Sequence, residues 1–196
     1  MNSVRRIRQA LREFDDLTDI GEIGRRYFAM NAFDGTLTII GVLMGNLVAG
    51  VDSPRVVLST GLSTCIAMGI SGLWGAYLTE TAERKRALDD LGQQTLVDLT
   101  ATRIGRASRL AAIAVAVIDG LSPFLAALAV LIPFFVAGFF PAIEWVYYSS
   151  LGAGLLTLTA LGVFLGHISR QNLIVSGIRT VIAGVASIAI SLLLGE

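Results

Sequence analysis

The sequence predicts an all-α membrane protein with five transmembrane helices, and two observations lead to this fold class. Hydrophobic residues make up 54% of the chain and charged residues only 15%, whereas soluble domains have about 25% charged residues. The charges also leave long uncharged stretches, and a helix needs about 20 such residues to cross a bilayer. The predicted spans cover residues 27–51, 56–78, 120–143, 145–169 and 172–194.

The distribution of basic residues predicts how these spans are oriented. The net charge is zero, so overall charge gives no indication of nucleic-acid binding. All 15 Lys and Arg residues except Arg55 fall before the first span, between the second and third, or after the fourth. Because cytoplasmic loops carry the excess of Lys and Arg, the amino terminus is predicted inside and the carboxyl terminus outside.

Residues 1–26 are predicted to form a cytoplasmic segment with an amphipathic helix on the membrane surface. Apolar residues recur at helical spacing from Val4 to Phe14, and arginines occupy the other faces. This pattern is typical of a helix that binds anionic lipid at the interface. Gly21 and Gly24 are expected to end this helix before the first span.

The membrane domain, residues 27–196, is predicted to include a short cytoplasmic helical segment at about residues 80–109. Good helix formers without Gly or Pro follow the second span, so its helix should extend into the cytoplasm. Glu80, Glu83 and Asp90 are spaced so that they share one stripe of this helix. The stripe either gathers metal ions or is a solvated face paired with neighbouring basic residues.

Two Asp-Gly pairs place carboxylates within the apolar spans. Asp34 lies eight residues beyond Arg26, about 12 Å past the last basic anchor of the first span. Asp119, which is also followed by a glycine, directly precedes the uncharged stretch of residues 120–143. Ionisable groups at this depth usually face a bundle interior or an ion pathway. Asp34 and Asp119 are therefore candidates for metal or proton binding, and the alternative is that both only cap helix ends.

The start of the third span is expected to be irregular. A cytoplasmic helix at about residues 95–110 leads into it, and Ser122 followed by Pro123 is the pattern of a new helix start. The residue before a proline avoids the helical conformation, so a break or kink is predicted between Asp119 and Pro123. Irregular backbone at membrane depth commonly surrounds a bound ion.

The sequence does not predict an enzyme. It has no Gly-rich phosphate loop, no His-Glu-x-x-His motif, and a single histidine and a single cysteine. An Asp-Gly pair also opens the motif of the CDP-alcohol phosphatidyltransferases, but residues 38–50 lack the further aspartates of that motif. The remaining oxygen ligands suit ferrous iron or manganese as a passing substrate, with no permanently bound cofactor. Asn31, Met68 and Asp90 are possible accessory ligands, although a membrane-helix Met more often serves packing.

Two stretches together resemble the vacuolar iron transporter family, in a short prokaryotic form. The first is Arg26-Tyr27-Phe28 with Asn31-Ala32-Phe33-Asp34-Gly35-Thr36-Leu37-Thr38, Gly41 and Gly45, and the second is Ser71-Gly72-Leu73-Trp74-Gly75-Ala76-Tyr77. The resemblance implies a homodimer in the cell membrane that exports or sequesters cytosolic ferrous iron or manganese in exchange for protons. It also implies an ion path along the first and second spans at the dimer interface, with Asp34 as the membrane carboxylate.

The second span departs from the family pattern. Gly72 and Ala76 occupy the positions where the family has Met and Glu, and Met68 and Glu80, each one turn away, are the residues that can replace them. Two hypotheses follow. The chain is either an antiporter in which Asp34, Glu80 and Glu83 bind metal, or a non-transporting membrane anchor or assembly protein with structural Asp-Gly caps.

Overall fold

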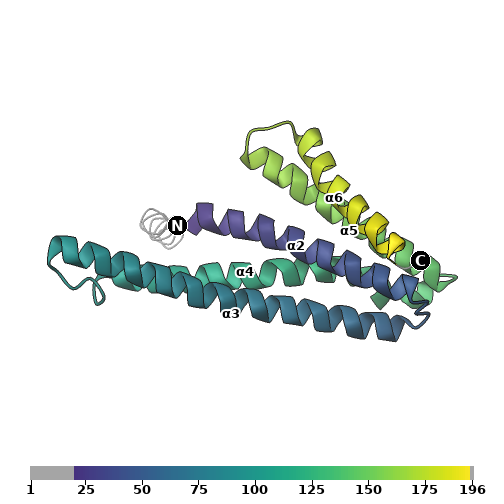
Figure 1. Ribbon diagram of the computed structural model, residues 1–196, viewed down its shortest axis with the longest axis horizontal. Helices are drawn as coiled ribbons and strands as arrows, with labels where there is room; N and C mark the ends of the chain where they lie inside the picture. Colours follow the sequence, from purple (N-terminus) through teal and green to yellow (C-terminus); the bar gives the residue numbers. More distant parts are fainter. Residues whose placement is uncertain (1–19, 195–196) are drawn as a thin grey trace, which may run out of the picture.

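The computed structural model describes residues 20–194, which form an all-α fold (Figure 1). Five helices are each long and apolar enough to cross a membrane, so the chain is a multi-pass membrane protein, as the sequence predicts. The amphipathic helix expected before residue 20 lies outside the described residues. The helices are α2 (Ile20–Val48), α3 (Pro54–Thr95), α4 (Arg103–Phe135), α5 (Ile143–Ile168) and α6 (Leu173–Leu193), with a short 3-10 helix η1 (Ala137–Phe139).

Helices α3 and α4 form a long antiparallel hairpin that extends beyond the rest of the bundle (Figure 1). Helix α2 packs on α4 and also contacts the α5–α6 hairpin. The start of α2, the α3–α4 loop and the α5–α6 turn lie toward one end of the bundle, which is the end that carries most of the basic residues. We call this the inner end, following the predicted orientation, and Arg55 lies at the opposite, outer end.

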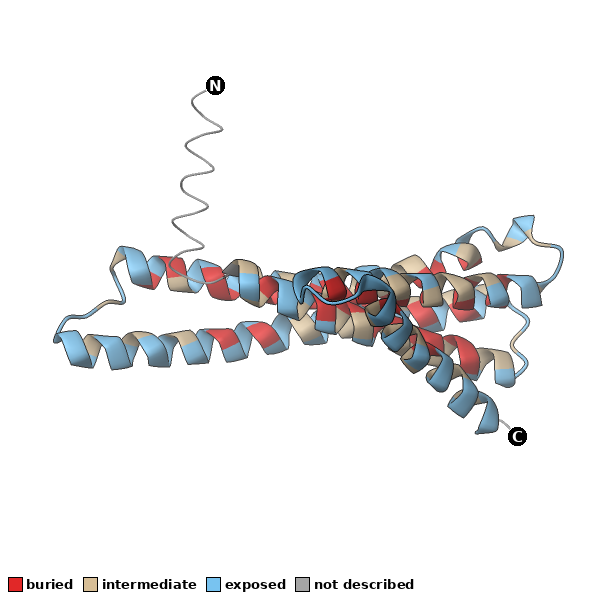
Figure 2. Ribbon diagram, turned by 90° about the horizontal axis from the view of Figure 1, so that it is seen from above, coloured by how far each residue is buried: buried red, intermediate tan, exposed pale blue. Residues whose placement is uncertain are grey.

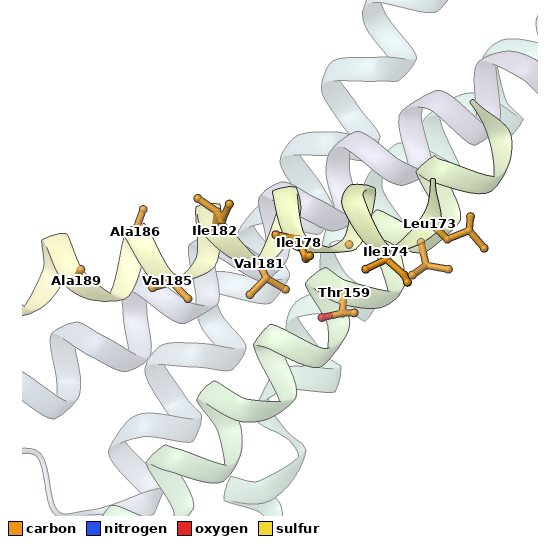
Figure 3. A pocket seen from close by; sticks show the side chains of 11 residues that line it. Thr159, Leu173, Ile174, Ile178, Val181, Ile182, Val185, Ala186 and Ala189 are labelled. Atoms are coloured by element: carbon orange, nitrogen blue, oxygen red, sulfur yellow. The ribbon is translucent and has the colours of Figure 1, made fainter. Parts of the chain in front are cut away.

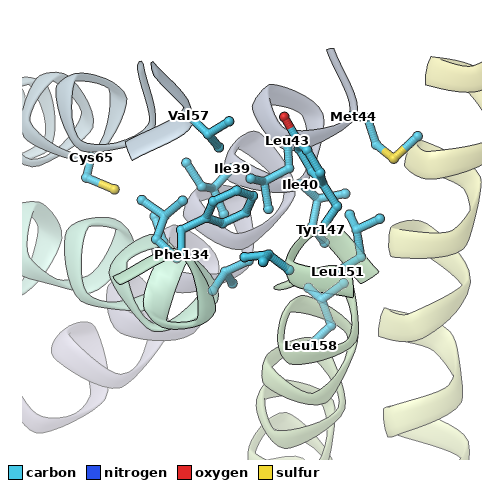
Figure 4. Packing of buried hydrophobic residues seen from close by; sticks show 14 residues of the cluster. Ile39, Ile40, Leu43, Met44, Val57, Cys65, Phe134, Tyr147, Leu151 and Leu158 are labelled. Carbon is cyan, nitrogen blue, oxygen red and sulfur yellow. The ribbon is translucent and has the colours of Figure 1, made fainter. Parts of the chain in front are cut away.

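The apolar core lies toward the outer end, where α2, α4 and α5 meet (Figure 4). The rings of Phe134 and Tyr147 pack edge to face with centroids 5.0 Å apart. The Tyr147 hydroxyl donates a 2.8 Å hydrogen bond to the carbonyl oxygen of Val51, which ties α5 to the α2–α3 turn. By contrast, α6 and the end of the α3–α4 hairpin are largely exposed (Figure 2).

Close backbone contacts join α3 to α4. A Cβ atom on Gly120 would lie 2.6 Å from the carbonyl oxygen of Gly69 and 2.8 Å from the backbone nitrogen of Leu73. No side chain fits in this space, so glycine is required where the two helices cross. Such small-residue contacts are a common means of packing membrane helices.

The predicted break between Asp119 and Pro123 is wrong, because α4 runs through these residues without interruption. Pro123 removes one hydrogen bond from the helix, and its ring fits beside Gly35 of α2, whose Cβ would lie 2.6 Å from the Pro123 Cα. The Ser122 hydroxyl donates to the Ile118 carbonyl within the helix instead of capping a new one. Packing against a neighbouring glycine therefore accommodates the proline.

Two further helix boundaries differ from the prediction. Gly21 and Gly24 do not end a helix before the first span, because both lie within α2, where Gly24 is buried against Ile118 of α4. The helix expected at about residues 95–110 is replaced by a loop up to Thr102, the N-cap of α4. The backbone N–H and hydroxyl of Thr100 donate to Asp98 in this loop and lower the pKa of its carboxyl.

Candidate functional site

A polar cluster joins α2, α3 and α4 in the inner half of the bundle. The extended helix α3 supplies two residues that lie one turn apart, α2 supplies two, and α4 supplies one. Its members are Tyr27, Asn31, Glu80, Arg84 and Asp119. We refer to these five residues as the polar cluster.

Glu80 occupies the part of the polar cluster nearer the inner end. It is a buried carboxylate, with 8% of the residue exposed. One carboxylate oxygen accepts a 2.9 Å hydrogen bond from Nε of Arg84, and the other lies 3.3 Å from the Tyr27 hydroxyl, which donates to it. Burying a carboxylate is costly unless it is paired and hydrogen-bonded, and Arg84 and Tyr27 supply both conditions.

Asp119 occupies the deeper part of the polar cluster and is equally buried. The side-chain amide of Asn31 donates one hydrogen bond to the Asp119 carboxylate and another, of 2.9 Å, to the carbonyl oxygen of Tyr27. Asp119 is joined to Glu80 through Asn31 and Tyr27, which hydrogen-bond to these two carboxylates and to each other.

Pro123 adds a further oxygen to this region. Because proline has no N–H, the main-chain carbonyl of Asp119 loses its usual partner within the helix. This carbonyl faces Gly72 of α3, where a Cβ would lie only 2.9 Å from the oxygen. Asp119 therefore combines a buried carboxylate with a main-chain oxygen that is released from the helix.

Asp34 does not join the polar cluster. Asn31 contacts Asp119 and Gly35 contacts Pro123, so α2 and α4 run parallel with an offset of 88 residues. Asp34 is thus level with Ser122, about 4.5 Å farther along the bundle than Asp119. The two Asp-Gly pairs lie at nearly the same depth, but Asp119 is buried and Asp34 is exposed.

The exposed side of α2 forms a stripe that carries Asp34. Within the described part of the chain, the Asp34 side chain makes no hydrogen bond or ion pair. Gly41 and Gly45 follow it at helical spacing, and a Cβ on either would meet nothing within 4 Å. We call Asp34, Gly41 and Gly45 the open stripe. It faces away from the rest of the bundle.

The other predicted ligands are not assembled with Asp34. Glu83 and Asp90 are exposed on the part of α3 at the inner end, and Met68 is half-buried against the apolar core. Between residues 20 and 194, no three His, Cys, Asp or Glu side chains form a group that could hold a metal ion. Asp34, Glu80 and Glu83 therefore do not form one site within a chain, because Asp34 and Glu83 are exposed on α2 and α3, whereas Glu80 is buried.

The alternative role of the Asp-Gly pairs as helix caps is also wrong. Asp34 lies within α2 and Asp119 within α4, in both cases several turns from either end of the helix. The carboxylates therefore lie at membrane depth without any capping function. Gly35 and Gly120 instead allow close contacts between helices.

Tyr27 and Arg84 are the two members of the polar cluster that sequence reasoning missed as site residues. Arg84 follows Glu80 by four residues, a spacing that favours a salt bridge on a helix and could have been read from the sequence. The contact between Tyr27 and Glu80 joins positions 53 residues apart in the sequence. No local pattern reveals it.

The large groove along α5 and α6 is a poor candidate for a cation site. It has a volume of 770 Å³ and is lined by Thr159 and otherwise by glycine and aliphatic residues (Figure 3). The side chains shown in the figure offer a single hydroxyl group and no charge. Such a surface suits lipid chains and provides no ligand set for a metal.

Comparison with known proteins gives a relative for this chain. No model of a protein family matches the sequence. The chain is 32% identical over 173 residues to the uncharacterized protein MJ0645 of Methanocaldococcus jannaschii, and the alignment covers 87% of each protein. This identity extends through most of the chain, so the chain belongs to the same family as the archaeal protein.

Proposed function

We propose that this protein carries a divalent metal ion, ferrous iron or manganese, across the membrane in exchange for protons. The observation that carries the proposal is the pair of buried carboxylates, Glu80 and Asp119, which two different membrane helices hold in one polar cluster. Their oxygen ligands suit these metals. The resemblance to vacuolar iron transporters supports the same function, with export or sequestration of cytosolic metal.

The polar cluster provides a way to exchange a bound metal ion for protons or for the positive charge of Arg84. Without metal, Arg84 and Tyr27 stabilise Glu80, and the Asn31 amide stabilises Asp119. An arriving divalent cation would compete with Arg84 for Glu80, because both are attracted to the same carboxylate. Proton binding to the carboxylates would then release the metal, which is the exchange that an antiporter requires.

A second copy of the chain would complete the path at the open stripe. Asp34 is a carboxylate at membrane depth with no hydrogen-bond or ion-pair partner among residues 20–194, and the neighbouring Gly41 and Gly45 leave room for another helix to approach closely. Pairing of two open stripes would bury both Asp34 side chains at one interface. This arrangement agrees with the homodimer that the family resemblance implies.

The exposed acids of α3 would gather metal before it enters the membrane. Glu83 and Asp90 lie on the helical extension at the inner end, on the predicted cytoplasmic side. They are more accessible than Glu80 and so would contribute to capture rather than to translocation. Changing both to amides should raise the metal concentration needed for transport without abolishing it.

Metal flux into liposomes tests this function. Purified protein should take up Fe²⁺ or Mn²⁺ when a pH gradient is imposed, as followed with a trapped metal-sensitive dye. Asp34→Asn should abolish the flux, because it keeps the volume of the side chain but removes the charge that titrates. Asp119→Asn should reduce the flux at least about tenfold, the lower range for loss of a metal-site partner. Glu144→Gln, which alters an exposed acid at the outer end, is the control.

The competing function is that of a membrane anchor or assembly protein that transports nothing. The observation in its favour is that the chain itself satisfies Glu80 and Asp119, through Arg84, Tyr27 and Asn31. Folded wild-type protein without any metal flux under a pH gradient would support this function. Normal flux in Asp34→Asn protein, with folded but inactive Asp119→Asn protein, would instead assign the ion path to α4.

A further inference from the structure

A polar cavity lies between α3 and α4, and Arg84 is the one residue of the polar cluster that lines it. It has a volume of 480 Å³, within the range of about 300–1,000 Å³ that is usual for small-molecule sites. Helix α3 contributes Arg84 and Lys85, and helix α4 contributes Ser108 and Arg109. We call this cavity the basic pocket.

The charge of the basic pocket is suited to an anion. Arg84, Lys85 and Arg109 line it, and none of its lining residues is a carboxylate. Lys85 and Arg109 are exposed and form no ion pair within residues 20–194. Arg84 donates to Glu80 through its Nε, and its two terminal nitrogens take no part in that hydrogen bond. The hydroxyl groups of Thr81 and Ser108 supply further hydrogen-bond donors.

The position of the basic pocket is suited to a lipid rather than to a free ion. The uncharged stretch of α3 ends at residue 79, and that of α4 begins at residue 110. The basic pocket spans this border, since its basic residues lie on the polar side and Tyr77, Ala112 and Ile113 line it on the membrane side. A phosphate group and the start of an acyl chain would match these two halves.

We propose that the basic pocket binds the phosphate head group of an anionic phospholipid from the inner leaflet. Basic pockets between transmembrane helices on the cytoplasmic side are a known means of recognising such head groups. Lys85 and Arg109 reach the phosphate from opposite walls, and Thr81 and Ser108 donate hydrogen bonds to it. This lipid site does not depend on metal transport, although Arg84 connects it to Glu80.

Native mass spectrometry of the full-length protein in a neutral detergent tests the lipid site. The probes are phosphatidylglycerol and phosphatidylcholine with identical acyl chains, added at increasing concentration. The test variant is K85Q/R109Q, and the matched control is R86Q/R106Q, which removes two arginines from the same two helices outside the basic pocket. Circular dichroism establishes that both variants remain helical.

The wild type should bind phosphatidylglycerol at least about tenfold more tightly than phosphatidylcholine, because each basic residue near a lipid phosphate contributes about fivefold. K85Q/R109Q should lose this preference and R86Q/R106Q should retain it. An equal loss in both variants would overturn the proposal in favour of diffuse charge attraction. Displacement of phosphatidylglycerol by equimolar sodium phosphate would overturn it in favour of a free-phosphate site.

Discussion

Asn31 shows how one side chain organises the buried charge of this protein. Its amide has two N–H groups, and they are divided between the Asp119 carboxylate and the Tyr27 carbonyl. A buried carboxylate with no hydrogen-bond donor would destabilise the folded protein by the full cost of removing it from water, about 1–3 kcal/mol or more. Asn31 therefore stabilises the charge on α4 from a position on α2, and it fixes the register of the two helices.

Substitutions at Asp119 should separate stability from transport. Asp119→Asn keeps an oxygen that can accept from Asn31, whereas Asp119→Ala leaves the Asn31 donor unpaired. The Ala variant should therefore unfold more readily than the Asn variant by about 1–3 kcal/mol, measured by thermal unfolding in detergent. Both variants should reduce metal flux, since both lack the charge of Asp119. Equal stability of the two variants would show that the contact with Asn31 contributes little.

The arrangement of α3 and α4 depends on glycine at the crossing point. Gly120 lies against the backbone of Gly69 and Leu73, so the two helices approach more closely than side chains would allow. The same close packing holds the Asp119 carbonyl against Gly72. The glycines therefore set the spacing of α3 and α4, the two helices that carry Glu80 and Asp119.

Gly120→Ala should therefore destabilise the hairpin by about 1–3 kcal/mol, the usual cost of overpacking a close contact. The measurement is thermal unfolding in detergent. Gly75→Ala is the matched control, because a Cβ on Gly75 would meet nothing within 4 Å. The control should be neutral or stabilising, since alanine favours a helix over glycine by about 1 kcal/mol. Equal effects of the two substitutions would contradict the close crossing.

For the whole molecule, the open stripe indicates where a second copy would pack. Helix α3 is also mostly exposed along its apolar length, with buried positions only at Val57, Gly61, Cys65, Ala76 and Glu80. A single chain in lipid can expose apolar helices, but it gains nothing by exposing the carboxylate of Asp34. The proposed homodimer would cover that carboxylate.

Gly41→Leu should convert the proposed homodimer to a monomer, because a large side chain would block close approach along the open stripe. Size-exclusion chromatography with light scattering measures the change in mass. Ala160→Leu is the control, since it enlarges an exposed small residue on α5 away from the open stripe. A monomeric wild type would exclude the dimer, and a dimeric Gly41→Leu protein would place the interface elsewhere.

The orientation of the whole bundle gives a further prediction. The described basic residues lie mainly at one end of the bundle, so we expect the amino terminus inside and Glu196 outside. Reporter fusions at the two termini measure this directly. A cytoplasmic reporter at Glu196 would mean that one of the five helices does not cross the membrane.

The sequence by itself determined the membrane class and the number of spans, because a bilayer requires long apolar helices whose length and composition can be read locally. It also predicted Asp34, Glu80 and Asp119 as candidate site residues. Only the tertiary structure decided which of them face inward. It buried Asp119, exposed Asp34 and kept α4 continuous through Pro123. The physical reason is that these outcomes depend on contacts between residues far apart in sequence, such as Asn31 with Asp119 and Gly35 with Pro123, which no local spacing reveals.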